Sequence, residues 1–147
     1  MPCVILLLKS QHSQLLDSAH ALARTAASRR ETWPGDLYTF RRTLVRHDRM
    51  ERDVFQRLGA PVPAVGLSGA FDLALASQPG LDAVAVAAAA QHISRVIADH
   101  ADAQEDDLFP GLVRRHDESV RKRLGDRYYR MTLIDAEMDD AEMPIVA

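Results

Sequence analysis

The sequence predicts an all-α protein folded as an up-down antiparallel four-helix bundle with an extra C-terminal helix. The composition combines 47% apolar residues with only 5% aromatic residues, a balance that suits closely packed helices better than a sheet sandwich. Between the turn signals of the chain, the apolar residues recur every three or four positions, which is the helical spacing. At 147 residues the chain has the length of one domain with a real core.

The turn signals divide the chain into five helical segments. Two strong breaks lie at residues 59–63 and 78–80, and a weaker one lies at 33–35, each rich in proline and glycine. Asp36 and Asp82 are expected N-caps, Gly59 an expected helix stop, and Pro110 an expected kink. The predicted helices span about residues 4–30, 37–58, 65–77, 83–113 and 117–133. We expect residues 1–134 to form the bundle and residues 135–147 to be an acidic, flexible tail.

Composition and charge narrow the classes of partner and compartment. The net charge of −3 is too small to indicate a nucleic-acid or membrane partner. The apolar run Val4–Leu8 is too short to span a membrane and lacks the flanks of a secretory signal. The single cysteine, Cys3, excludes an internal disulfide and is compatible with a reducing compartment. We therefore expect a soluble cytoplasmic protein.

Polar residues stand on helix faces that should be apolar. His47 and Glu51 occupy core positions four residues apart, so their side chains stack on one face, while His12 and His100 lie on the apolar stripes of two other helices. Alone, His12 reads as an ordinary core histidine and the His47–Glu51 pair as an exposed ion pair. Three inward histidines on three helices, with a carboxylate, instead favour a metal site for iron, manganese or zinc.

Other polar residues receive an ordinary interpretation. His20 and His92 lie at the edges of their stripes, and His116 follows the break at Pro110. The sequence also lacks a nucleophile elbow, a phosphate loop and a paired reactive cysteine, so it does not predict an enzyme.

Three motifs follow one another along the chain: His12-x-x-Leu15-Leu16, His47-x-x-x-Glu51 and His100-x-x-x-Gln104-Glu105-x-x-Leu108-Phe109-Pro110. In this order they resemble the hemerythrin-like (HHE cation-binding) family, and the resemblance covers about residues 4–113. It implies an up-down four-helix bundle with a non-haem, oxo-bridged di-iron centre that binds dioxygen or senses oxygen, iron, nitric oxide or oxidative stress. The implied metal ligands are His12, His47, Glu51, His100 and Glu105.

The chain departs from the family pattern at two positions. The third helix carries no histidine, and Ser68 stands about where one is expected. Four residues after His100 comes Gln104 in place of an acid, and Glu105 follows one step later, about 140° around a regular helix from His100. A local π-bulge could bring Glu105 inward. The remaining ligands suffice for one metal ion and are few for two.

Two functions of different classes follow from these observations. The first is a metal-binding protein that holds one or two non-haem iron ions, with zinc or manganese as alternatives, and takes part in oxygen, iron or redox stress sensing or response. Its partners would be the metal and dioxygen or related small oxidants. The second is a degenerate, metal-free helical bundle that works as a protein-interaction module. The extra helix leaves open a homodimer or another protein partner.

Overall fold

The computed structural model describes residues 3–142, and the side chains of residues 3–133. All regular structure in this range is helical, without strands, which confirms the all-α prediction. The elements follow in the order α1 (Val4–Ala27), α2 (Trp33–Leu58), α3 (Leu67–Ala76), α4 (Ala83–Ala103), the π-helical turn η1 (Gln104–Leu108), α5 (Phe109–Arg115) and α6 (Glu118–Glu142). No helix among these residues is long and apolar enough to cross a membrane.

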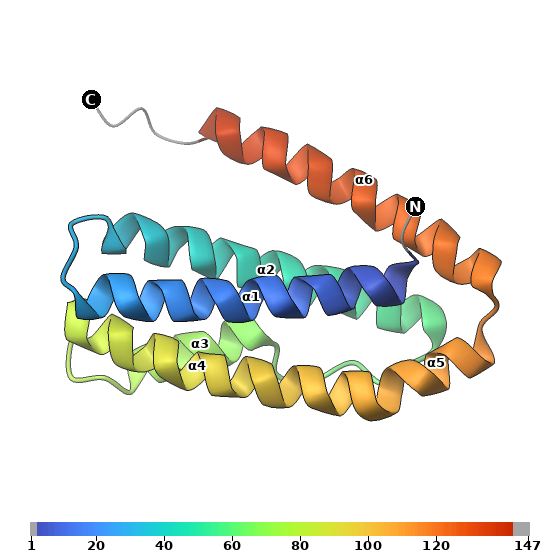
Figure 1. Ribbon diagram of the computed structural model, residues 1–147, viewed down its shortest axis with the longest axis horizontal. Coiled ribbons are helices and arrows are strands. Elements are labelled where there is room, and N and C mark those ends of the chain that lie inside the picture. The colour runs from blue at the N-terminus through green and yellow to red at the C-terminus, as the bar shows by residue number, and fades with distance from the viewer. Residues whose placement is uncertain (1–2, 143–147) are drawn as a thin grey trace.

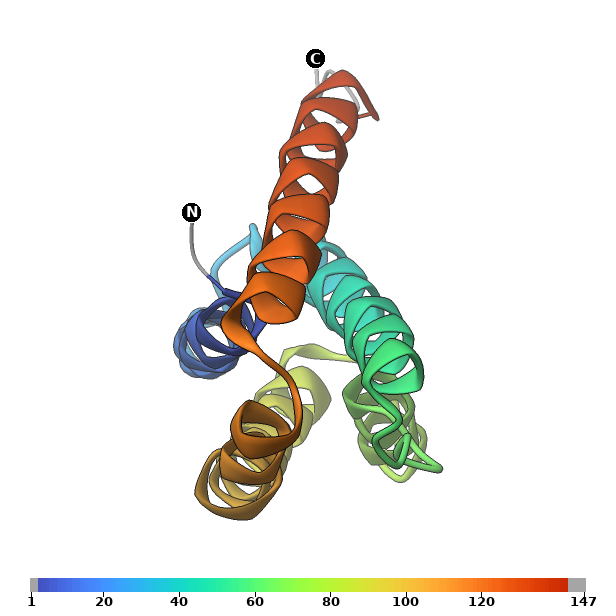
Figure 2. The same ribbon diagram turned by 90° about the vertical axis from the view of Figure 1, so that its right-hand side faces the viewer.

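The first four helices pack as a closed ring of neighbours. The α1 helix contacts both α2 and α4, and the shorter α3 contacts the same two helices from the other side. Figure 1 shows that each of these helices runs opposite to the one before it in sequence. The α6 helix contacts α1 and crosses the outer side of the α1–α2 pair, then leads away from it (Figures 1 and 2).

Most predicted helix ends agree with the structure, and one break does not. Asp82 caps α4, because its Oδ1 accepts a hydrogen bond of 2.8 Å from the backbone N–H of Ala85. Gly59 ends α2 in the left-handed conformation with φ 67°. The break expected at residues 33–35 lies earlier: α1 ends at Ala27 and α2 already begins at Trp33, so that Asp36, the expected N-cap, lies with Pro34 in the first turn of α2. Proline is tolerated there because those N–H groups need no helical partner.

The C-terminal half is divided differently from the prediction. The long helix expected to reach residue 113 stops at Ala103, and a π-helical turn joins it to α5, with Pro110 in the first turn of α5. The last helix continues to Glu142 and so includes residues 135–142 of the predicted tail. Residues 143–147 of that tail lie outside the described residues.

A layer of polar side chains separates two apolar cores along the bundle. Among residues 3–133, the buried polar and charged side chains are His12, His47, Glu51 and Gln104, and they lie in this layer. The core on one side, which we call the α3-side core, includes Leu15, Ala19, Phe40, Leu44, Phe71, Ala89, Ala90, Ile93 and Ile97. The core on the other side, the α6-side core, includes Val4, Leu8, Val54, Phe55, Leu58, Phe109, Leu112 and Tyr128.

Candidate metal centre

His12 is a buried histidine without a hydrogen bond. Only 2% of its surface is exposed, and neither ring nitrogen has a hydrogen-bond partner among the described residues. Leu8 and Leu15, one turn away on either side of it in α1, belong to the two apolar cores. A buried imidazole normally finds a partner, because leaving it unpaired costs about 1–3 kcal/mol. Two unpaired nitrogens therefore point to a group that the polypeptide does not itself supply.

The ring of His47 is oriented by Gln11. Its Nδ1 donates a hydrogen bond of 2.9 Å to the side-chain oxygen of Gln11, and the amide nitrogen of Gln11 donates to the sulfur of Met50 at 3.0 Å. Since the proton of a neutral ring is then on Nδ1, the Nε2 of His47 carries a lone pair. This atom lies 2.8 Å from Oε2 of Glu51. A lone pair and a carboxylate oxygen repel at this distance, so a proton or a metal cation has to lie between them.

Glu51 is the point on which the other side chains converge. Its Oε2 also accepts a hydrogen bond of 3.0 Å from Nε2 of His100, and its Oε1 accepts one from the amide nitrogen of Gln104. Glu51 is 3% exposed, and a buried carboxylate is costly unless cations or strong donors surround it. The surrounding groups here are imidazoles, which bind transition metals well.

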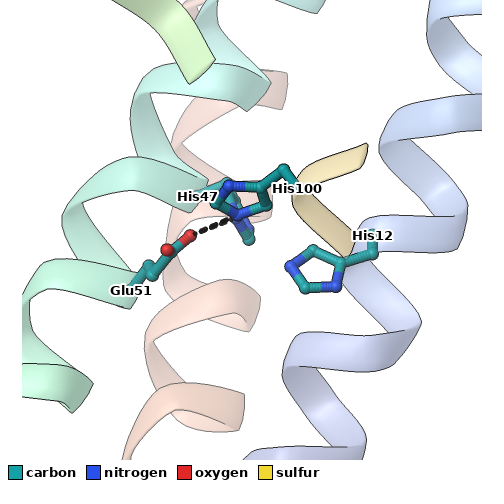
Figure 3. A group of neighbouring side chains, drawn as sticks. All are labelled: His12, His47, Glu51 and His100. Carbon is teal, nitrogen blue, oxygen red and sulfur yellow. Dashed lines mark hydrogen bonds and ion pairs between the residues drawn. The ribbon is translucent and has the colours of Figure 1, made fainter. Parts of the chain in front are cut away.

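The four side chains are close enough to hold one metal ion. One ligand atom from each of His12, His47, Glu51 and His100 can be chosen so that all lie within 4.8 Å of one another. Figure 3 shows His12 facing the other three across the space between their helices. Two ligands on opposite sides of an ion, with bonds of about 2.1 Å, stand about 4.2 Å apart. A small contraction of the cluster would therefore enclose one ion.

The protonation states of two ligands also suit a cation. Burial, followed by the charges of His47 and His100, lowers the pKa of His12 from 6.5 to about 3, so that this ring is neutral near pH 7. Burial alone would raise the pKa of Glu51, but hydrogen bonds and charge from His100 and His47 outweigh it and hold this pKa well below 4.5. A neutral imidazole and an ionised carboxylate are the forms that bind metals.

Glu105 does not join this cluster, and the π-helical turn explains why. The turn begins at Gln104, where the backbone N–H of Phe109 bonds to the carbonyl of Gln104, five residues earlier. Such i→i+5 bonding places residues five apart over one another. Gln104, still one regular turn after His100, is thus buried together with Phe109, while Glu105 is only half-buried. The predicted π-bulge exists, but it turns Phe109 inward instead of Glu105.

Phe109 forms one wall of the centre. Its ring stacks on that of His12, with centroids 5.9 Å apart and planes 5° from parallel. This contact fixes the imidazole from the α6-side core. The side-chain oxygen of Gln104 remains buried without a hydrogen bond, so an amide oxygen is available close to the four ligands.

The α3 helix, the remaining member of the ring, contributes no residue to this cluster. Ser68 of α3 bonds instead to Asp48 of α2, whose carboxylate also accepts hydrogen bonds of 2.9 Å from the backbone N–H groups of Leu67 and Ser68. Asp48 therefore caps α3 from a neighbouring helix. Gly66 permits this approach, because a Cβ at that residue would lie 2.5 Å from Oδ2 of Asp48.

Sequence reasoning did not find Gln11 or Asp48. Each adjoins a predicted ligand in sequence, and neighbouring residues on a helix point about 100° apart, so neither was expected to face the interior. The histidines given an ordinary interpretation do lie elsewhere: His20 and His92 are exposed, and Nε2 of His116 bonds to the carbonyl of Leu58 at 2.9 Å.

Comparison of the chain with protein-family models, curated proteins and solved structures found no match. Fold and site together define a helical protein with a buried cluster of three histidines and one glutamate that could hold a metal ion.

Proposed function

We propose that this chain is a hemerythrin-like metal-binding protein that holds one ion in an up-down four-helix bundle formed by α1–α4. The cluster of His12, His47, Glu51 and His100 is the observation that carries the proposal. The ring of contacts α1–α2–α3–α4 supports the bundle. A second iron ion, as in the family's di-iron centre, would need further ligands. The α3 helix does not offer one near its start, because the hydroxyl of Ser68 is bound to Asp48.

Non-haem iron is the metal that we propose, in a role in oxygen, iron or redox stress sensing or response. Three imidazoles and one carboxylate suit iron, and zinc and manganese remain alternatives. Bound iron would supply one-electron chemistry. The residues of the chain would bind the ion, exclude water with Phe109 and the two apolar cores, and keep His47 oriented through Gln11.

A shallow pocket, open to solvent, adjoins the proposed site. It has a volume of about 350 Å³ and is lined by His100, Gln104 and a mainly apolar wall of Phe55, Pro61, Val62, Pro63, Ala103 and Leu108. Its mainly apolar wall would admit a small uncharged molecule such as dioxygen to the side of His100. Dioxygen or a related small oxidant is therefore the second partner that we propose.

Metal loading with paired histidine variants tests the proposal. Protein is loaded anaerobically with ferrous iron and desalted, and iron is measured by elemental analysis together with an absorption spectrum. We expect about one iron per chain in wild type, as the four ligands imply. His12→Ala and His100→Ala should lose most of it, while the exposed controls on the same helices, His20→Ala and His92→Ala, should not. Equal iron in wild type and His12→Ala would refute the assignment.

The alternative is a metal-free bundle that serves as a protein-interaction module. Gln104 in place of an acid and the absence of a ligand from α3 favour it. Thermal melts with and without chelator distinguish the two, because a bound ion stabilises the folded state by about 2.7 kcal/mol at a hundredfold excess over Kd. Identical melting temperatures, with no iron retained, would establish the alternative.

A further inference from the structure

A second, larger cavity opens between α6 and the side of the α1–α2 pair. It has a volume of about 890 Å³ and is lined by residues of all three helices. We call it the wedge, because α6 diverges from the two helices beneath it (Figures 1 and 2). Its volume lies within the range of small-molecule sites in proteins.

The lining of the wedge is strongly basic. Among the side chains that the structure describes, five arginines and one acid, Asp53, line it. Asp53 is itself paired with Arg57, with an N–O distance of 3.2 Å. Within residues 3–133, Asp53 therefore does not cancel the positive charge of the arginines that line the wedge. The arginines are Arg41, Arg42, Arg46, Arg49 and Arg127.

Two of these arginines have no ion-pair partner in the described part of the chain. Arg41 pairs with Asp72 through two hydrogen bonds of 2.9 Å, Arg42 lies over the ring of Tyr38, and Arg46 also makes an interaction of its own. Arg49 on α2 and Arg127 on α6 are exposed and stand on two walls of the same cavity. A guanidinium offers planar paired donors that match a carboxylate or a phosphate.

A buried hydroxyl supplies an independent observation at the same place. Tyr128 also lines the wedge, and its side chain is 1% exposed. Its Oη has no hydrogen-bond partner among the described residues. A buried tyrosine hydroxyl normally has one, so the Tyr128 hydroxyl is an unsatisfied hydrogen-bond donor.

We propose that the wedge binds a small molecule bearing at least one phosphate or carboxylate group, held by Arg49, Arg127 and the hydroxyl of Tyr128. Arg49, Arg127 and Tyr128 line one basic cavity from two helices, and none of their donor groups has an acceptor among the described residues. The three donors are not metal ligands, but the wedge adjoins the metal centre, because His47 and Gln11 both line it and Gln11 accepts the hydrogen bond of His47. The wedge does not require a bound metal.

Isothermal titration calorimetry of the full chain tests this proposal. Inorganic pyrophosphate is the phosphate probe and citrate is the carboxylate probe, both at constant ionic strength. Metal is first removed, and the chelator is then removed by desalting because chelators are themselves polyanions. We expect saturable binding of at least one probe, and the probe that binds more tightly identifies the class of ligand.

Three variants assign the binding to the wedge. Affinity should fall by about tenfold or more in the double variant Arg49→Gln/Arg127→Gln, and by about tenfold in Tyr128→Phe. Arg52→Gln is the matched control, because Arg52 is an exposed arginine of α2 that does not line the wedge, and it should bind like wild type. Absence of binding of both probes, or equal affinity in wild type and the double variant, would overturn the proposal. The double variant changes only exposed side chains. It therefore tests whether the probe binds in the wedge even if Tyr128→Phe misfolds.

Discussion

The two apolar cores on either side of the polar layer are built differently. In the α3-side core, small residues such as Ala19, Ala89 and Ala90 are fully buried and let four helices pack closely. The α6-side core lies beyond the start of α3, and it is closed by large side chains, among them Phe55, Phe109 and Tyr128, and by α5 and α6. The polar layer thus lies between the part of the interior that α3 covers and the part that α5 and α6 close. This position explains why α3 offers its capped N-terminus at that level and no ligand.

Replacing one aromatic residue in each core should separate stability from metal binding. Phe71 and Phe109 are both essentially buried, so Phe71→Ala and Phe109→Ala should each lower the free energy of unfolding by about 3–5 kcal/mol. Only Phe109 stacks on His12. Urea unfolding and metal titration should therefore show reduced metal affinity in Phe109→Ala alone. Equal loss of affinity in both variants would mean that the two cores support the centre equally.

The pH dependence of stability should report the polar layer specifically. The pKa of His12 in the folded state, about 3, lies below its ordinary value of 6.5. Its contribution is therefore complete above pH 6.5 and is lost as the pH falls toward 3, and the lowered pKa of Glu51 acts in the same direction. Without metal, the free energy of unfolding should decrease by about 2–4 kcal/mol between pH 7 and pH 4. Urea titrations at both pH values measure it, and an unchanged value would contradict the assignment.

Joining the two cores should stabilise the protein while destroying the centre. In His12→Leu an apolar side chain replaces two unpaired buried nitrogens, so the metal-free protein should gain about 1–3 kcal/mol of stability. Metal binding should disappear, and the decrease in stability toward pH 4 should become smaller. Thermal melts with and without metal provide the measurement, and His20→Leu is the control on the same helix. A destabilised His12→Leu protein would show that the imidazole packs better than a leucine can.

Loosening α3 should affect mainly the α3-side core. A methyl group at Gly66 would collide with the carboxylate of Asp48, so Gly66→Ala should cost about 1–2 kcal/mol through displacement of the cap. Gly35→Ala is the control, since a Cβ there meets nothing within 4 Å. Chemical denaturation compares the two. If Gly66→Ala is as stable as wild type, the contact between Asp48 and α3 contributes little.

The sequence was most informative where one helix alone decides the outcome. Helical spacing predicted the all-α class and placed His12, His47, Glu51 and His100 on inner faces, because each placement depends only on the period of its own helix. The caps at Asp82 and Gly59 were predictable for the same reason. No longer-range information was needed for these features.

Features that depend on contacts between two helices could not be predicted from the sequence. Asp48 caps α3 from α2, and Gln11 orients His47 from α1; neither contact follows from the spacing within one helix. Glu105 was expected at the centre because the resemblance to the hemerythrin-like motif implies an acid after His100, and Gln104 is not one. The choice between the two depends on where the π-helical turn begins, which packing of Phe109 helps to decide.

The π-helical turn adds one residue to a helix that would otherwise keep a single register from α4 to α5. Before the turn, the face of the helix that points inward is the face of His100. After the turn, it is the face of Phe109. Winding the same residues as a regular α-helix, without the π-helical turn, would rotate everything downstream by about 100°. Phe109 and Leu112 would then leave the interior together while His100 stayed in place. One extra residue in the turn thus allows His100 of α4 and the apolar residues Phe109 and Leu112 of α5 to face the interior together.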